Sequence, residues 1–148
     1  MTKEEILQRL PYTPPFLFVD ALEYIDEEKV IGSYTFDAQM PCYKGHFSDY
    51  PVTPGVLLTE VMAQTGLVCL GIYLLRDTLT AHTPRVAMTA TYIDFYLSVF
   101  PGETVTVHAE KVYFRFGKLK CSVVLKNASG EDICGGTIEG MIINKPNE

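Results

Sequence analysis

The second half of the chain is a succession of segments whose apolar and polar residues follow the pattern of β-strands. Short groups of turn-forming residues, PGE, GK and NASGED, separate these segments. Near the N-terminus, two further segments of the same kind are joined by the turn DEEK. Because most connections are short, we expect mostly antiparallel pairing. The six predicted strands cover residues 16–25, 30–36, 85–96, 103–116, 118–127 and 131–143.

A long, mainly apolar segment from Gly55 to about Arg76 lies between the second and third strands and predicts a helix. Thr53 is the predicted N-cap and Pro54 the predicted first helical residue, where its missing N–H costs nothing. The helix would be about 33 Å long, which suits one central helix wrapped by a sheet. That length could also span a bilayer, but polar residues such as Glu60 favour a buried core helix and no membrane span.

The rest of the chain adds one short helix and one long loop. Residues 2–10 predict the helix, because Thr2 and Glu5 have the spacing of a capping box. Residues 38–53 form a loop rich in proline, glycine and aromatic residues. With no repeats and no long linker, the chain predicts a single α+β domain over residues 1–148.

Composition and charge exclude several classes of protein. A chain of 148 residues with 47% hydrophobic and 20% charged residues is typical of a globular protein. Its net charge of −6 argues against nucleic-acid binding, which calls for a basic footprint. The four cysteines show no metal-ligand or C-x-x-C spacing, so we expect free thiols in a reducing cytoplasm. The N-terminus lacks the apolar core of a signal peptide, which also favours a cytoplasmic location.

Glu60 is the most informative single residue, because it is a carboxylate on an otherwise apolar helix face. Gln64 lies four residues further on, on the same face. Burial would raise the pKa of Glu60 and keep the group protonated at neutral pH, ready to donate a proton. The alternatives are a structural carboxylate satisfied by backbone groups and a helix edge that faces solvent.

Two more residues offer chemistry close by in the sequence. Gly55 lies near the helix start, where N–H groups without a helical partner can stabilise negative charge on a carbonyl oxygen. His46, in the preceding loop, has the near-neutral pKa of a general base. The alternatives are an ordinary capped helix start and an exposed loop histidine. Together, a base, an acid and an oxyanion donor would remove the proton beside a carbonyl and expel a hydroxyl two carbons away.

The segment GHFSDYPVTPGVLLTEVMAQ, residues 45–64, resembles the 3-hydroxyacyl-[acyl-carrier-protein] dehydratases of bacterial fatty acid synthesis. That family has the pattern GHFPGxPxxPGVLxxEAxAQ. His46 precedes Gly55 by nine residues and Glu60 by fourteen, and Gln64 follows Glu60 by four, as in the pattern. LPYTPPFLFVDALEYI resembles the family's opening LPHRYPFLLVDRV, and YIDFYLSVFPGETVTV resembles a later strand and turn. The resemblance covers most of the chain.

The resemblance implies a role for each matched residue. His46 would be the catalytic base and Glu60 the catalytic acid, while the Gly55 N–H would bind the thioester carbonyl. Gln64 would support Glu60, and Phe47 is grouped with Gly55 and Gln64 as substrate-binding.

The resemblance also implies an architecture and a partner. We expect a hot-dog fold in a homodimer or an assembly of dimers, with His46 of one chain facing Glu60 of the other. The substrate would be a 3-hydroxyacyl group carried by acyl carrier protein, in fatty acid or related acyl or polyene biosynthesis, without metal or redox cofactor. That partner is acidic, so basic residues are candidates for its docking: Arg76, Arg85, Arg115, Lys118 and Lys120.

The chain departs from the family pattern at two places. Ser48-Asp49 stands where the family has Pro-Gly, and Tyr12-Thr13-Pro14 stands where it has His-Arg-Tyr. The first departure lies next to the base and bears on the preferred acyl chain. Three alternatives stay open: a hot-dog thioesterase, an enoyl-CoA hydratase, and a catalytically silent acyl-binding subunit.

Overall fold

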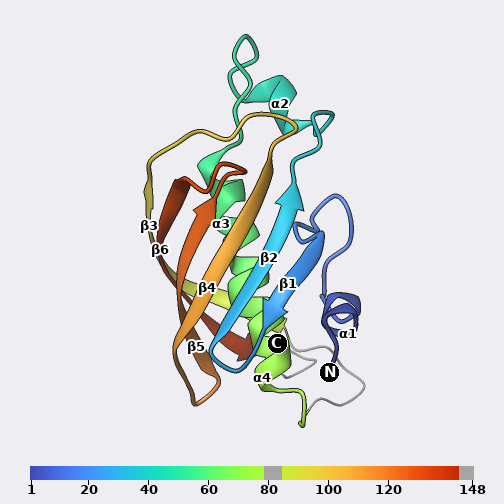
Figure 1. The fold of residues 1–148 in the computed structure, drawn as a ribbon, viewed down its shortest axis with the longest axis vertical. Coiled ribbons are helices and arrows are strands. Elements are labelled where there is room, and N and C mark those ends of the chain that lie inside the picture. Colours follow the sequence, from blue (N-terminus) through green and yellow to red (C-terminus); the bar gives the residue numbers. More distant parts are fainter. Residues whose placement is uncertain (79–84, 144–148) are drawn as a thin grey trace.

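The protein is seen in a computed structural model that describes residues 1–78 and 85–143. Its largest element is a six-stranded sheet in the order β1-β2-β4-β5-β6-β3, with every neighbouring pair antiparallel (Figure 1). The sheet therefore places β3, which follows the long helix in sequence, at the edge beside the last strand. The strands are β1 (Ala21–Ile25), β2 (Lys29–Thr35), β3 (Arg85–Phe95), β4 (Thr104–Arg115), β5 (Lys118–Lys126) and β6 (Asp132–Ile143).

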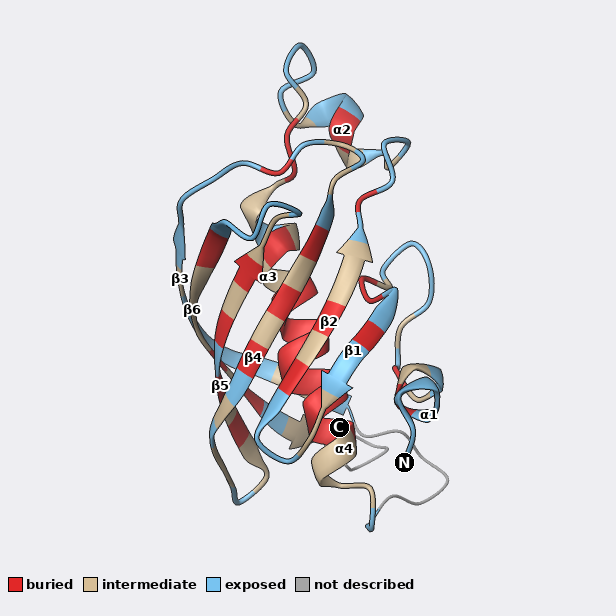
Figure 2. Ribbon diagram, viewed as in Figure 1, coloured by how far each residue is buried: buried red, intermediate tan, exposed pale blue. Residues whose placement is uncertain are grey.

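One long helix lies along the concave side of this sheet, as predicted. It begins as α3 (Gly55–Ala63), continues through a π-helical segment, η1 (Gln64–Cys69), and ends as α4 (Leu70–Leu74). By length and hydropathy the span Gly55–Leu74 is a candidate membrane helix, but 72% of its apolar window is buried inside the fold. Figure 2 shows the buried residues concentrated on this helix and on the strand positions that face it. The prediction of a core helix is confirmed.

The start of the long helix differs from the prediction. Thr53 is not the N-cap; Pro54 occupies that position with extended backbone angles, and Gly55 is the first helical residue. The reason is a competing partner, since the Thr53 hydroxyl lies 2.7 Å from the hydroxyl of Tyr43. The Thr53 side chain thus ties the preceding loop to the helix instead of capping it.

The N-terminal region agrees with the prediction in part. The short helix α1 (Lys3–Gln8) is present with the predicted capping box of Thr2 and Glu5. The first strand was predicted from residue 16, but β1 starts only at Ala21. Before it, the backbone of residues 16–18 bonds to a helix side chain, as described below, so it is not available to the sheet. The loop at 38–53 contains one short helix that was not predicted, α2 (Cys42–Gly45).

The core lies between helix and sheet, and alternate strand residues fill it. On β4, Val105, Val107 and Ala109 point inward and are buried. A side chain at Gly66 would meet Ala109 at 3.2 Å, so the glycine allows the helix to approach the sheet closely. The four cysteines are free thiols, three of them buried, as the sequence predicted.

Candidate active site

Glu60 lies on α3, two turns from the helix start, and is partly buried. Burial raises the pKa of its carboxyl group above the ordinary value, and a hydrogen bond from Gln64 opposes part of that rise. The Gln64 Nε2 atom donates that bond to the Glu60 Oε2 atom at 2.9 Å. The prediction of a carboxyl group with a raised pKa, held by Gln64, is confirmed.

Gln64 is fully buried and uses both ends of its amide. Its Oε1 atom accepts from the backbone N–H of Phe18 at 2.8 Å, and its Nε2 atom also donates to the carbonyl of Phe16 at 3.0 Å. These two backbone bonds fix the amide orientation, because a flipped amide would face a donor with a donor. Sequence reasoning missed the segment 16–18, which reads as plain strand and is 46 residues distant.

His46 follows α2 and is held by its backbone and its ring. Its N–H donates to the Cys42 carbonyl at 2.9 Å. The ring Nδ1 atom lies 2.8 Å from the Val52 carbonyl oxygen. Since a carbonyl oxygen only accepts, Nδ1 carries the proton in the neutral ring and Nε2 keeps a free lone pair. His46 is therefore oriented as a base whose accepting nitrogen points away from its backbone anchor.

Phe47 lies directly against His46, with ring centroids 4.5 Å apart. It is 61% exposed and has a φ of 56°, a left-handed conformation that is uncommon for an aromatic residue. The turn that contains it continues to Tyr50, whose N–H donates to the Phe47 carbonyl at 2.7 Å. Phe47 thus presents an apolar surface to solvent beside the histidine.

Gly55 provides the first N–H of α3. Within the described residues this N–H makes no hydrogen bond, as expected for the first residue of a helix. The ring of Phe95, at the end of β3, packs where a side chain would be: a Cβ atom at Gly55 would lie 3.2 Å from the Phe95 Cε1 atom. The glycine therefore keeps the helix start open while an aromatic ring covers its flank.

Tyr12 is a further residue near Glu60 that sequence reasoning did not place in the site. Burial, with a smaller contribution from the charge of Glu60, raises the pKa of the Tyr12 hydroxyl to about 12. Its ring contacts Phe16 at 6.1 Å between centroids. The signal available in the sequence was the departure at Tyr12-Thr13-Pro14 from the pattern that the rest of the opening follows.

The five predicted residues fall into two groups within one chain. Glu60 and Gln64 are bonded to each other, and His46 stacks on Phe47, but His46 and Glu60 share no hydrogen bond in the described part of the chain. A hollow of about 330 Å³ on the outer face of β2, β4 and β5 contains none of the five residues. Across residues 1–78 and 85–143, no group of three or more His, Cys, Asp or Glu side chains is placed to hold a metal ion.

Comparison with known proteins identifies the family. Residues 10–134 match the family model of the FabA-like domain. The chain is 36% identical over 142 residues to the 3-hydroxyacyl-[acyl-carrier-protein] dehydratase FabZ of Clostridium perfringens, covering 93% of this chain and 96% of the relative. The chain belongs to the 3-hydroxyacyl-[acyl-carrier-protein] dehydratase family. Another FabZ dehydratase, from Sinorhizobium fredii, is 35% identical over 146 residues, covering 96% of this chain and 90% of the relative.

Solved structures show that this dehydratase family member has the hot-dog fold. A dehydratase heterocomplex from Xenorhabdus doucetiae matches with a TM-score of 0.78 and 12% identity, covering 98% of this chain and 93% of that chain. A thioesterase from Haemophilus influenzae matches with a TM-score of 0.69 and 14% identity, covering 97% and 92%. At such identities the likeness concerns the fold alone. The predicted family and fold are both confirmed.

Proposed function

We propose that this chain converts a (3R)-3-hydroxyacyl group on acyl carrier protein to the trans-2-enoyl group by loss of water. The observation that carries the proposal is the buried Gln64 amide, which holds the raised-pKa carboxyl of Glu60 on the helix that begins at Gly55. A carboxyl group that is protonated at neutral pH can donate a proton to a leaving hydroxyl.

Each of the three groups takes one part of the reaction. The His46 Nε2 atom removes the proton from C2, and the electron pair of that C–H bond forms the C2–C3 double bond. The Gly55 N–H stabilises the negative charge that develops on the thioester oxygen. Glu60 transfers its proton to the C3 hydroxyl as the C–O bond breaks, and water leaves. No electrons are gained or lost, so the reaction requires no redox cofactor.

The bond from His46 to the Val52 carbonyl helps the base in two ways. It selects the tautomer with a free Nε2 lone pair. Once Nε2 has taken a proton, Nδ1–H remains a donor to the same carbonyl, which stabilises the imidazolium. The ring of Phe47 and the segment around Gln64 would border the acyl thioester.

We propose further that the site is completed by a second copy of the chain. β3 is a sheet edge of 11 residues, and a long exposed edge strand is a template for pairing. Its large side chains Met88, Tyr92 and Phe95 are between 45% and 70% exposed. Antiparallel pairing of two β3 edges would cover these side chains and form a symmetric dimer. His46 of one subunit would then face Glu60 of the other, in a cytoplasmic enzyme.

A product assay tests the activity directly. The pure protein is incubated with carrier-bound 3-hydroxyacyl chains of graded length and saturation, and the products are followed by mass spectrometry. We expect loss of 18 Da from the acyl chain with the thioester intact. Release of free carrier thiol without an enoyl product would instead identify a thioesterase. No reaction until a second, homologous subunit is added would identify an acyl-binding subunit.

A further inference from the structure

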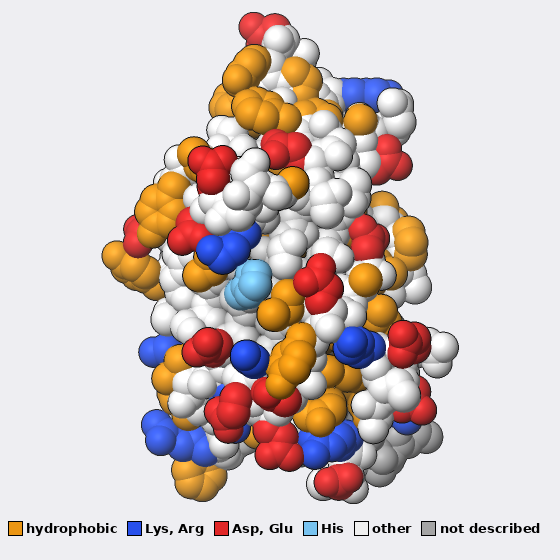
Figure 3. Space-filling model, viewed as in Figure 1, with side chains coloured by type: hydrophobic (Ala, Val, Ile, Leu, Met, Phe, Trp, Pro, Cys, Tyr) orange, Lys and Arg blue, Asp and Glu red, His pale blue; other side chains and the backbone are white. Residues whose placement is uncertain are grey.

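The outer face of the sheet carries a cluster of basic side chains at the end where α4 finishes. Lys118 and Lys120 alternate with the buried Leu119 and Cys121 on β5, so they point away from the helix. Arg115 lies opposite Lys118 across the β4–β5 hairpin. Figure 3 shows basic side chains gathered at this lower end of the molecule.

Arg85 extends the cluster on the neighbouring edge strand. It is exposed and pairs with Ile143 at the end of β6, while the next residue, Val86, packs inward near Gly71 and Gly140. The alternation of side chains along β3 therefore puts Arg85 on the outer face. We call Arg85, Arg115, Lys118 and Lys120 the basic face.

One carboxylate lies inside the basic face and organises it. Glu139 on β6 accepts from the Tyr113 hydroxyl at 2.9 Å and pairs with Lys118 at 3.6 Å and Lys120 at 3.8 Å. The Arg115 guanidinium stacks over the Tyr113 ring at 4.4 Å. Four cations thus surround a single anion, on a chain whose net charge is −6. A local patch of opposite sign to the whole molecule steers acidic partners toward one place.

The tip of the same hairpin exposes an aromatic ring. Phe116 is 96% exposed and has a φ of 53°, followed by Gly117 at 73°. Two consecutive left-handed residues form the tight hairpin turn that normally favours asparagine, aspartate or glycine at the first position. The chain instead has a phenylalanine there, where it gains nothing from burial. An exposed aromatic ring bordered by arginine has the composition of a protein-binding hot spot.

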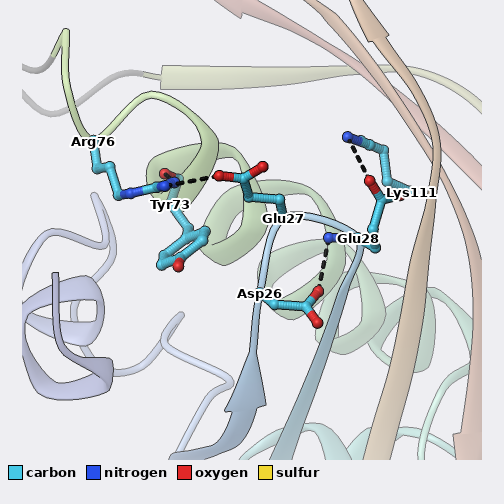
Figure 4. A network of polar contacts seen from close by, with 6 residues as sticks. All are labelled: Asp26, Glu27, Glu28, Tyr73, Arg76 and Lys111. Atoms are coloured by element: carbon cyan, nitrogen blue, oxygen red, sulfur yellow. Dashed lines mark hydrogen bonds and ion pairs between the residues drawn. The ribbon is translucent and has the colours of Figure 1, made fainter.

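The remaining basic candidate does not belong to this surface. Figure 4 shows that Arg76 points toward Glu27, with which it pairs at 2.9 Å, and donates to the Tyr73 carbonyl. In the same view Lys111 pairs with Glu28 at 3.4 Å. Both cations are committed to acidic neighbours near the β1–β2 turn, in contrast to the four that share Glu139.

We propose that the basic face, together with Phe116, is the surface on which the acidic acyl carrier protein docks. The inference rests on the proposed function, which supplies the partner. In the proposed dimer the antiparallel β3 strands would bring the Arg85 end of one subunit close to the Phe95 end of the other. Since Phe95 packs on Gly55, the basic face of one subunit would lie at the same end as the other subunit's active site. A carrier docked there could deliver its thioester across the subunit boundary.

Steady-state kinetics with two substrates test the proposal. One substrate is the carrier-bound 3-hydroxyacyl thioester, and the other is the same acyl group on N-acetylcysteamine, which has no carrier to dock. For the double variant Arg115→Gln and Lys118→Gln, we expect KM for the carrier substrate to rise about tenfold. Its kcat/KM for the small thioester should stay at the wild-type value. The matched control, Lys29→Gln with Lys126→Gln, removes the same charge elsewhere and should change neither.

A second variant separates docking from folding. Phe116→Gly suits the left-handed turn better than phenylalanine, so its melting temperature should equal or exceed that of the wild type. Its KM for the carrier substrate should nevertheless rise several-fold, about as expected for loss of one interface aromatic.

The outcomes distinguish the two proposals. Wild-type KM for the carrier substrate in both variants, with turnover of the small thioester intact, would overturn the docking surface alone. No dehydration of either substrate by the wild-type protein would overturn the proposed function. Cosedimentation with phosphatidylglycerol vesicles that is lost in both variants, while carrier KM is unchanged, would assign the surface to membranes and also overturn the proposal.

Discussion

The Gln64 Nε2 atom donates to the Glu60 Oε2 atom at 2.9 Å, and the other end of the same amide accepts from the backbone of Phe18. The donor end of Gln64 is therefore fixed toward the carboxyl group. Because Oε2 already accepts this bond, the acidic proton of Glu60 belongs on Oε1. The buried amide thus determines which oxygen of the acid faces the substrate.

Replacing the amide tests this arrangement. Gln64→Leu removes a bond that favours the charged form of Glu60, so the pKa of the carboxyl rises further. Since the protonated form is the active one, the alkaline limb of the kcat–pH profile attributable to Glu60 should move to higher pH. The variant should also lose about 2 kcal/mol of stability, because the Phe18 N–H and Phe16 carbonyl lose a buried partner. Thr65→Val, at the next buried helix position, is the control and should leave the pH profile unmoved.

The two proposed catalytic side chains should be separable from the fold. His46→Ala and Glu60→Gln are each expected to lower kcat by about 10²–10⁴-fold, the usual range for loss of a general base or acid. Both residues are only partly buried, so circular dichroism and melting temperature should remain close to wild type. Near wild-type turnover in either variant would contradict the assigned roles.

Mixing these two variants tests whether the site crosses subunits. A heterodimer of His46→Ala and Glu60→Gln chains has one site with both changes and one with neither, if base and acid come from different chains. Random exchange of subunits should then restore about a quarter of wild-type activity. Base and acid from the same chain would give no recovery, because every site would keep one lesion.

Stability should depend on pH through Glu60. Its pKa is raised in the folded state, so folding favours the protonated form, and the contribution of this group is fully present below its unfolded pKa near 4.5. That contribution is lost as pH rises through the folded pKa. Glu60→Gln removes the titration, and its stability relative to wild type should therefore increase from pH 4 to pH 8. Urea unfolding of both proteins at several pH values measures the difference, and parallel pH profiles would contradict the burial of the charge.

The helix start should tolerate no side chain. In Gly55→Ala the new Cβ atom would lie 3.2 Å from the Phe95 ring, which must shift and disturb the open N–H. We expect a loss of about tenfold or more in kcat/KM, consistent with damage to an oxyanion donor. Gly71→Ala is the matched control on the same helix, since its Cβ would make only ordinary contacts at 3.9 Å or more. That variant should keep full activity and equal or higher stability.

Local patterns were enough to predict what depends on neighbours in the chain. The capping box of Thr2 and Glu5, the burial of alternate residues on β4 and the four-residue step from Glu60 to Gln64 are all settled within a few residues. In such cases backbone geometry alone brings the groups together. The family motif added the spacing of His46 and Gly55, because it is continuous in sequence.

Features that depend on distant partners were decided only by the tertiary structure. Thr53 failed as a cap because the hydroxyl of Tyr43, ten residues away, competes for it. Residues 16–18 left the predicted strand because Gln64 satisfies their backbone groups from across the fold. The position of β3 at the sheet edge follows from its pairing with the last strand, as does the meeting of Arg85 with the β4–β5 hairpin. Local periodicity carries no information on such pairings, whereas long-range packing and hydrogen bonding select one of them.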